Sequence, residues 1–289
     1  MKRLYEEPDN DYSIEDLCAA QQISRSAYYH WLNGSKSPRE KTNDRLVREI
    51  KDIYEQHTDK GYRRIRDDLA RHYGEHVSDK RVLRLMRKEQ IQSTIKHPRN
   101  CCTRRASSPQ YTAENILARN FHAERPNEKW VTDVTEFKYC EGQEPKKLYL
   151  SAILDLFDRR IVGYMIGDSN DNRLVFDTLD KAASRNPNAH PLLHSDRGFQ
   201  YTSREFHARL QKYEMTQSMS RVGHCIDNGP MEGFWGILKR EMYYGHRYES
   251  REQLVRALES YLHYYNFERL QRRLNIMTPQ EYHDHYIAA

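Results

Sequence analysis

The chain has few cysteines and no long hydrophobic run, and these shortages exclude several classes of protein. No apolar run in the 289 residues approaches the roughly 18 residues that a membrane span needs. Residues 1–10 lack the apolar core of a signal peptide. The five cysteines are odd in number and form no Cys-x-x-Cys pair, which disfavours a disulfide framework or a zinc ribbon. We therefore expect a protein of a reducing cytoplasm without a membrane partner.

Positive charge is modest over the whole chain but concentrated in one segment. The net charge is +5, whereas residues 60–105 hold 14 Lys and Arg against five Asp and Glu. Such a block indicates a polyanionic partner, most often nucleic acid. On charge alone, a solvated helix face explains it equally well.

The first third of the sequence predicts short helices. Residues 13–32, broken at 22–24, have the outline of a helix-turn-helix, although a plain helical hairpin would give the same pattern. We read residues 35–42 as a polar linker, followed by helices at about 43–57 and 61–73 and by a basic helix capped by Ser78. That basic helix is a candidate for lying in a DNA groove. The predicted DNA-contacting side chains here are Arg63, Arg64, Lys80, Arg81 and Arg84.

After residue 121 the pattern becomes that of an α/β protein. Three strand-like segments, at 130–137, 148–155 and 160–166, precede alternating helices and short strands, which predicts a mixed sheet. The expected later elements are helices at 172–185, 203–212, 230–244 and 251–267 and short strands at 191–194 and 215–220. The predicted domains are a short helix-turn-helix-like segment (1–36), a helical DNA-binding segment (37–95), a basic linker (96–120) and a catalytic domain with C-terminal helices (121–289).

Three carboxylates occupy positions typical of reactive groups. Asp133 lies in the first strand, Asp196 ends a short apolar strand, and Glu232 lies in the first turn of a helix after a tight turn. Each alone is better explained as a surface, turn or first-turn residue than as a reactive group. Together they would supply the hard oxygen ligands of two Mg²⁺ ions about 4 Å apart, as phosphodiester cleavage requires. We expect Asp133 to serve both ions, Asp196 one and Glu232 the other.

The spacing of these acids supports a single site. Thirty-five residues separate Asp196 from Glu232, and Lys239 follows Glu232 by seven. Seven residues are two helical turns, so Lys239 is expected on the same helix face as Glu232. Its ammonium could hold a DNA phosphate beside the metals.

The motifs around these residues resemble, in order and over nearly the whole chain, the second-frame (OrfB-type) transposases of the IS-three family of insertion sequences, which are relatives of retroviral integrases. The matching segments are 130–137, 194–201, 227–241, 265–269 and 278–282, with 61–65 and 82–86 upstream. The resemblance implies an RNase H-like fold of the integrase catalytic core type, Mg²⁺ or Mn²⁺ as cofactor, and a DDE active site formed by Asp133, Asp196 and Glu232.

The same resemblance implies an activity and partners. We expect 3′-end cleavage by water, followed by attack of the freed 3′-OH on a second phosphodiester. The DNA partners would be the terminal inverted repeats and the target, bound by a homo-oligomer in the bacterial cytoplasm, at the nucleoid. An upstream-frame product, supplied as a frameshift fusion, would add the main end-recognition helix-turn-helix and a leucine zipper.

Some positions depart from the family pattern, and two other functions stay open. Gln271 stands where many relatives carry His, and Asp158 where serine is commoner, while Asp155 recurs in relatives and could simply shape the sheet. The N-terminal His and Cys residues lack the spacing of the zinc module found in retroviral integrases, so we expect no such module here. The alternatives are a DNA-binding regulator with an inactive catalytic half, which would lack metal-dependent cleavage, and an RNase H-like nuclease, which would form no joined product.

Overall fold

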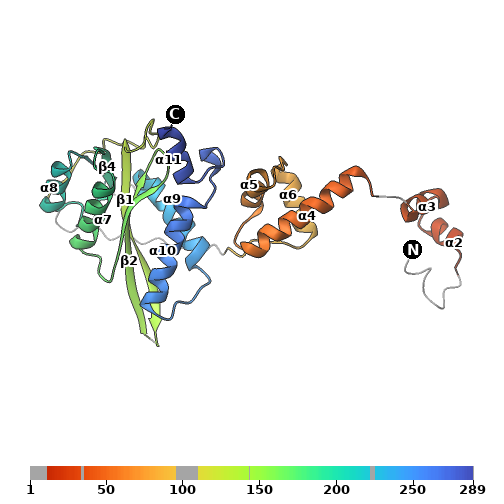
Figure 1. Ribbon diagram of the computed structural model, residues 1–289. Helices are drawn as coiled ribbons and strands as arrows, with labels where there is room; N and C mark the ends of the chain where they lie inside the picture. The colour runs from red at the N-terminus through yellow and green to blue at the C-terminus, as the bar shows by residue number, and fades with distance from the viewer. Residues whose placement is uncertain (1–11, 34–35, 96–109, 143, 222–224, 289) are drawn as a thin grey trace.

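A computed structural model describes residues 12–33, 36–95, 110–142, 144–221 and 225–288. Residues 129–219 contain a five-stranded sheet in the order β3-β2-β1-β4-β5 (Figure 1). The first three strands are antiparallel neighbours, and β4 and β5 run parallel to β1. The strands are β1 (Lys129–Glu141), β2 (Glu144–Asp155), β3 (Ile161–Gly167), β4 (Leu192–Ser195) and β5 (Thr216–Met219). The predicted mixed α/β sheet is therefore confirmed.

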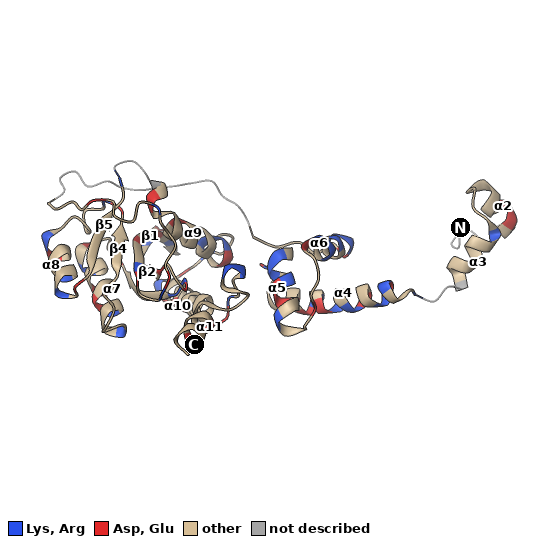
Figure 2. Cartoon of the chain, turned by 90° about the horizontal axis from the view of Figure 1, so that it is seen from above, with Lys and Arg blue, Asp and Glu red and all other residues tan. Residues whose placement is uncertain are grey.

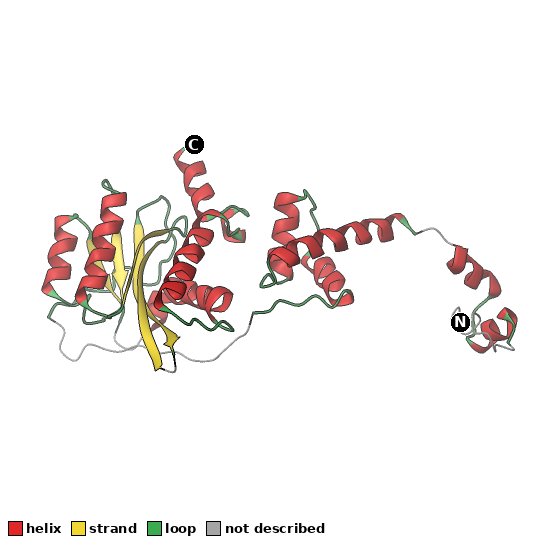
Figure 3. Cartoon of the chain, turned by 60° about the horizontal axis from the view of Figure 1, so that its bottom comes forward, coloured by secondary structure: helices red, strands yellow, loops and turns green. Residues whose placement is uncertain are grey.

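Helices cover both faces of this sheet (Figure 3). On one face, α7 (Asn172–Arg185) and α8 (Arg204–Lys212) enclose a core that includes Trp130. On the other face, α9 (Gly229–Leu238) and α10 (Arg251–Phe267) pack on a core that includes Val131. Side chains alternate along a strand, so Asp133 shares the α9 and α10 face with Val131.

The N-terminal half is helical, as predicted. The helices are α2 (Ile14–Ala20), α3 (Arg25–Asn33), α4 (Pro38–Gln56), α5 (Tyr62–His72) and α6 (Asp79–Lys88). The last three share a small core built from Leu46, Ile65 and Val82, among others. These apolar positions recur at helical spacing on one face of each helix. Lys80, Arg84, Arg87 and Lys88 of α6 are exposed, whereas Arg81 is only partly exposed.

Some elements differ from their predicted bounds or helix type, because local capping and tertiary contacts decide these. Helix α4 begins at Pro38, inside the segment read as a linker, since Ser37 and Glu40 form a capping box and proline suits the first helical turn. The helix expected at 230–244 ends as an α-helix at Leu238 and continues as a π-helical turn, η2 (Lys239–Tyr243). There the Tyr243 hydroxyl bonds to the backbone of Lys138 in β1.

The helical half docks on the C-terminal elements of the α/β half. Arg272, in the 3-10 helix η3 (Arg272–Leu274), bonds Asp67 at 2.8 Å and Asp79 at 2.7 Å. Arg71 lies 2.6 Å from Glu281 of α11 (Pro279–Ile287), a helix that the sequence analysis did not foresee. Within the described residues, no helix is both long and apolar enough to cross a membrane.

Candidate active site and DNA-binding surface

Asp133 lies in β1, and Asp196 directly follows β4, the parallel neighbour of β1. Val131 of β1 pairs with His194 of β4. Asp133 lies two residues after Val131, and Asp196 lies two residues after His194. The indole N–H of Trp235 in α9 donates a 3.0 Å hydrogen bond to Asp133 Oδ2. The backbone N–H of Gly198 donates one of 2.8 Å to Asp196 Oδ1. Both carboxylates are thus oriented by donors of their own.

The two aspartates share an electrostatically crowded environment. Burial, the negative charge of Asp196 and that of Glu232 raise the pKa of Asp133 to about 7, although the Trp235 hydrogen bond acts in the opposite direction. Burial also raises the pKa of Asp196, against the effect of the Gly198 N–H. Like charges at close range disfavour ionisation unless a cation lies between them.

Glu232 lies in the first turn of α9 and is exposed. Its charge reaches Asp133, but among the described residues no three His, Cys, Asp or Glu side chains converge closely enough to hold a metal ion. The structure therefore brings two of the predicted ligands together and leaves the third nearby on the surface.

A cluster of two partly exposed arginines around a buried aspartate fixes the turn that precedes α9. Asp227 is fully buried and accepts two hydrogen bonds of 3.0 Å from the Arg221 guanidinium and one of 2.6 Å from Arg119. Hydrogen bonds from Arg221, followed by those from Arg119, hold the pKa of Asp227 well below its usual range. Next to it, the Asn228 side chain donates to the carbonyl of Thr132, the neighbour of Asp133. These bonds tie the start of the Glu232 helix to β1.

His194, Asp227, Asn228 and Trp235 were quoted only as parts of motifs, and the sequence analysis gave them no role. His194 is fully buried between the hydroxyls of Ser218 and Ser220, at 2.9 and 3.1 Å. Burial lowers its pKa to about 4, so the imidazole is neutral near pH 7. A polar residue inside an apolar strand was the available signal for such a structural role.

The sequence analysis considered Lys239 as a phosphate contact and Asp155 as a residue that shapes the sheet. Lys239 opens the π-helical turn, and its ammonium lies 5.2 Å from the ring centre of Phe137, which is a cation–π geometry. Asp155 is fully buried, and its carboxylate accepts the backbone N–H groups of Asn127 and Phe157. These contacts favour the sheet-shaping role of Asp155 over a direct one.

The predicted DNA-contacting residues fall into two groups. Arg63, Lys80 and Arg84 are exposed, whereas Arg81 bonds to Asn43 Oδ1 at 2.8 Å. The Arg64 guanidinium lies 2.7 Å from Asp59 and 3.0 Å from Glu241. Because Arg64 is committed to these internal partners, its contacts disfavour a role in binding DNA in this conformation.

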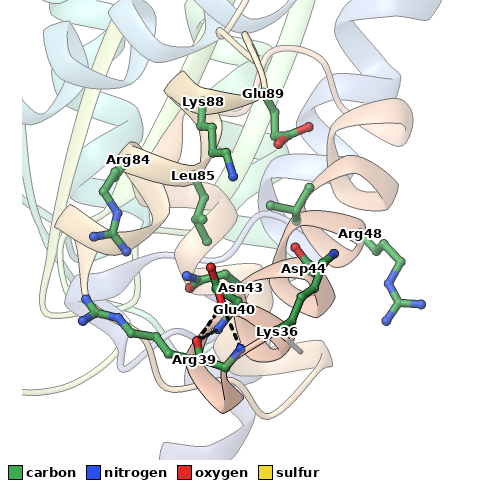
Figure 4. Close-up of a pocket in the computed structure, with 12 residues that line it drawn as sticks. Lys36, Arg39, Glu40, Asn43, Asp44, Arg48, Arg84, Leu85, Lys88 and Glu89 are labelled. Carbon is green, nitrogen blue, oxygen red and sulfur yellow. Dashed lines mark hydrogen bonds and ion pairs between the residues drawn. The ribbon is translucent and has the colours of Figure 1, made fainter. Parts of the chain in front are cut away.

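Of these three exposed residues, only Arg84 lines an open cleft between α4 and α6. The cleft has a volume of about 760 Å³, and Arg84 and Lys88 of α6 face Arg39 of α4 across it (Figure 4). Its acids have intramolecular partners: Asp44 bonds Lys36 at 2.6 Å, and Glu40 caps its own helix. Figure 2 shows that Lys and Arg also occur along α5 and α6.

Comparison with known families agrees with this architecture. Residues 123–225 and 232–287 each match an integrase core domain model, and residues 41–99 match an HTH-like domain. Together with the sheet, these matches define an integrase-core protein that carries a helical HTH-like domain.

Individual relatives show which integrase-core proteins this chain resembles. The chain is 38% identical over 273 residues to a putative transposase, InsK of insertion sequence element IS150 from Escherichia coli K12, covering 94% of this chain and 93% of that one. It is 27% identical to the transposase InsF of IS3A from the same organism, over the full length of both. The chain belongs to this family of insertion-sequence transposases.

Among solved structures, the chain is similar to the catalytic core domain of HTLV-2 integrase in complex with magnesium. The two are 20% identical with a TM-score of 0.44, and the match covers 56% of this chain and 99% of that one.

Proposed function

We propose that this protein is a DNA strand transferase that cleaves the 3′ ends of an insertion sequence and joins them to target DNA. Its catalytic and metal-holding residues would be Asp133, Asp196 and Glu232. The observation that supports this most strongly is the juxtaposition of Asp133 and Asp196 on neighbouring strands, within electrostatic reach of Glu232.

The carboxylates fit a divalent metal. Hard oxygen donors suit Mg²⁺ or Mn²⁺. Burial, followed by the negative charges of Asp196 and Glu232, raises the pKa of Asp133, and a bound cation would offset those charges. Two such ions, when bound, would activate the attacking oxygen and stabilise the leaving one. The protein's own part is to orient ligands: Trp235 holds Asp133, the Gly198 N–H holds Asp196, and the Asp227 cluster fixes the helix of Glu232.

The helical half would bind the DNA. Exposed Arg63, Lys80 and Arg84 are proposed phosphate contacts, and Lys239 is proposed to hold a phosphate near the acids. Terminal inverted repeats and target DNA would be the substrates, bound by a homo-oligomer in the cytoplasm, with an upstream-frame product as a further, fused part.

A strand-transfer assay tests this proposal. Labelled duplex ends of the element, supercoiled target DNA and Mg²⁺ are incubated with the wild-type chain, with Glu232→Gln and with Glu205→Gln, which alters an exposed acid in the first turn of α8. Joined product from the wild type and the control, and none from Glu232→Gln, is the expected result.

Other outcomes distinguish the alternatives. Cleaved ends without joined product would indicate the nuclease. If no protein cleaves, the assay is repeated with the fused reading frames. Cleavage by the fusion alone would assign this chain the catalytic part of a longer enzyme, and a second failure would favour the DNA-binding regulator.

A further inference from the structure

The open cleft between α4 and α6 carries an excess of positive charge. Five basic and three acidic residues line it. The three acids have partners of their own. Asp44 bonds Lys36, and Glu40 caps its own helix. Glu89 lies 2.8 Å from Lys51, which does not line the cleft. The acids therefore leave most of the basic side chains of the cleft without an intramolecular counter-charge.

Three of these cations face one another across the cleft. Arg39 of α4 and both Arg84 and Lys88 of α6 are exposed, and Figure 4 shows them on its opposite walls. Within the part of the chain that the structure describes, none of the three forms a hydrogen bond or an ion pair. Like charges around a common hollow repel each other, and an anion between them relieves that repulsion.

A hydrogen bond across the cleft holds its walls in place. The Arg81 guanidinium of α6 donates bonds of 3.1 and 2.8 Å to Asn43 Oδ1 of α4. Val47 and Leu85 line the cleft and also pack in the small core that the helices share. The cleft is thus a preformed feature of the helical half, and a preformed site costs less to order on binding.

The free cations of α6 form a row rather than a single cluster. Lys80, Arg84 and Lys88 are each four residues apart and all exposed, so they lie on one helix face and span about 12 Å at about 1.5 Å per residue. Like charges at this spacing destabilise a helix. One small anion does not reach both ends of the row, whereas a DNA strand carries a charge about every 3.4 Å of its axis. The row therefore fits an extended polyanion with regularly spaced charges.

We propose that the cleft between α4 and α6 holds the sugar–phosphate backbone of duplex DNA, with Arg39, Arg84 and Lys88 as its phosphate contacts. The backbone continues along α6 to Lys80. This adds Arg39 and Lys88 to the contacts already proposed and assigns Arg81 the support of the cleft. The choice of DNA rests on the proposed function.

The salt dependence of duplex binding tests the cleft with matched variants. The logarithm of the binding constant for a labelled duplex is measured against the logarithm of salt concentration for wild type, Arg39→Ala and Lys88→Ala. The controls are Lys41→Ala and Arg87→Ala, which remove exposed basic residues from the same two helices but outside the cleft. Every variant thus loses one positive charge.

Loss of one phosphate contact reduces the magnitude of the slope by about 0.9. We expect this reduction in Arg39→Ala and Lys88→Ala and not in the controls. Slopes that fall equally in all four variants, or that stay at the wild-type value in both cleft variants, would overturn the proposal.

Amine labelling of the wild-type protein tests the same contact without a substitution. An acetylating reagent modifies exposed lysines, and mass spectrometry follows Lys88 and, as the control on α4, Lys41. Bound duplex should slow the labelling of Lys88 several-fold and leave Lys41 unchanged. Unchanged labelling of Lys88 in saturating duplex contradicts the proposal. Equal protection of Lys88 by polyglutamate, at the same concentration of negative charge, would assign the cleft to an acidic protein segment instead.

The variant Asp133→Asn separates this proposal from the proposed function. It should lose strand transfer and keep both the salt slope and the protection of Lys88. If wild type shows both cleft effects but transfers no strand, only the proposed function fails. Strand transfer by a wild type whose Lys88 stays unprotected would overturn the cleft proposal alone.

Discussion

The guanidinium of Arg64 in α5 lies 3.0 Å from the carboxylate of Glu241, in the π-helical turn that continues the helix of Glu232. Glu241 also pairs with Arg269 at 2.8 Å and accepts a 2.8 Å hydrogen bond from the Tyr261 hydroxyl. The Arg64 and Glu241 side chains are mostly buried, with 18% and 6% exposed. One acid therefore ties the HTH-like segment to the core of the catalytic half.

Replacing Arg64 with alanine should destabilise the protein strongly. Removing one partner of a buried ion pair typically costs about 3–5 kcal/mol, and here Arg269 continues to neutralise Glu241, so we expect the lower end of that range. Arg63→Ala, at the exposed neighbouring position, should change stability by less than about 0.5 kcal/mol. Urea unfolding measures both. Equal, small effects would show that the two halves do not rely on this contact.

The sheet could be predicted from sequence because its strands have clear patterns, whereas the docking of Arg64 could not. Thr132, Val134 and Phe137 mark a strand by β-branched and aromatic character alone. Glu241 is far from Arg64 in sequence, so their contact is decided by tertiary packing. The sequence of a basic segment does not reveal which of its arginines is buried. The three acids stay a prediction made from their positions and spacing. The exposure of Glu232 could not be predicted, because a spacing does not specify a side-chain position.

Without metal, stability should fall as pH rises towards neutrality. The pKa of Asp133 is about 7 in the folded protein and about 4 in the unfolded chain, so between these values the folded state binds the extra proton. Its contribution is complete below about pH 4 and is lost as pH rises through 7. Tm measured from pH 4 to 8 should show a smaller loss in Asp133→Asn than in wild type. Some loss should remain in the variant, because burial and the charge of Asp158 also raise the pKa of Asp155 to about 7.

Magnesium should reverse that trend. Metal ligands must be deprotonated, so the Tm increase caused by Mg²⁺ should grow as pH rises from 6 to 8. Asp133→Asn and Glu232→Gln should each reduce the increase. A Mg²⁺ effect that is independent of pH, or the same in both variants as in wild type, would place the ion elsewhere.

His194 should destabilise the protein in acid rather than take part in catalysis. Its pKa of about 4 in the folded state lies below the usual 6.5, so the unfolded chain binds the extra proton between these values and stability falls as pH drops from 6.5 to 4. His194→Gln should remove that dependence, and the difference from wild type isolates it from the opposite trend of Asp133. His190→Gln, at an exposed histidine, is the control and should titrate like wild type.

Trp235 should support catalysis through the single hydrogen bond that its indole donates to Asp133. A hydrogen bond to a charged group contributes about 1.5–3 kcal/mol, so Trp235→Phe should lower the rate of strand transfer by about 10- to 100-fold and raise the pKa of Asp133 further. The matched control is Trp130→Phe, which also removes a buried indole but one that bonds to Asn127 at 3.2 Å, with its ring on the opposite face of the sheet. We expect the control to lose stability and to keep most of its rate once folded. Equal rate losses in the two variants would mean that Trp235 acts through packing alone. A loss confined to Trp235→Phe, together with a pH–rate profile moved towards higher pH, would assign it the positioning of Asp133.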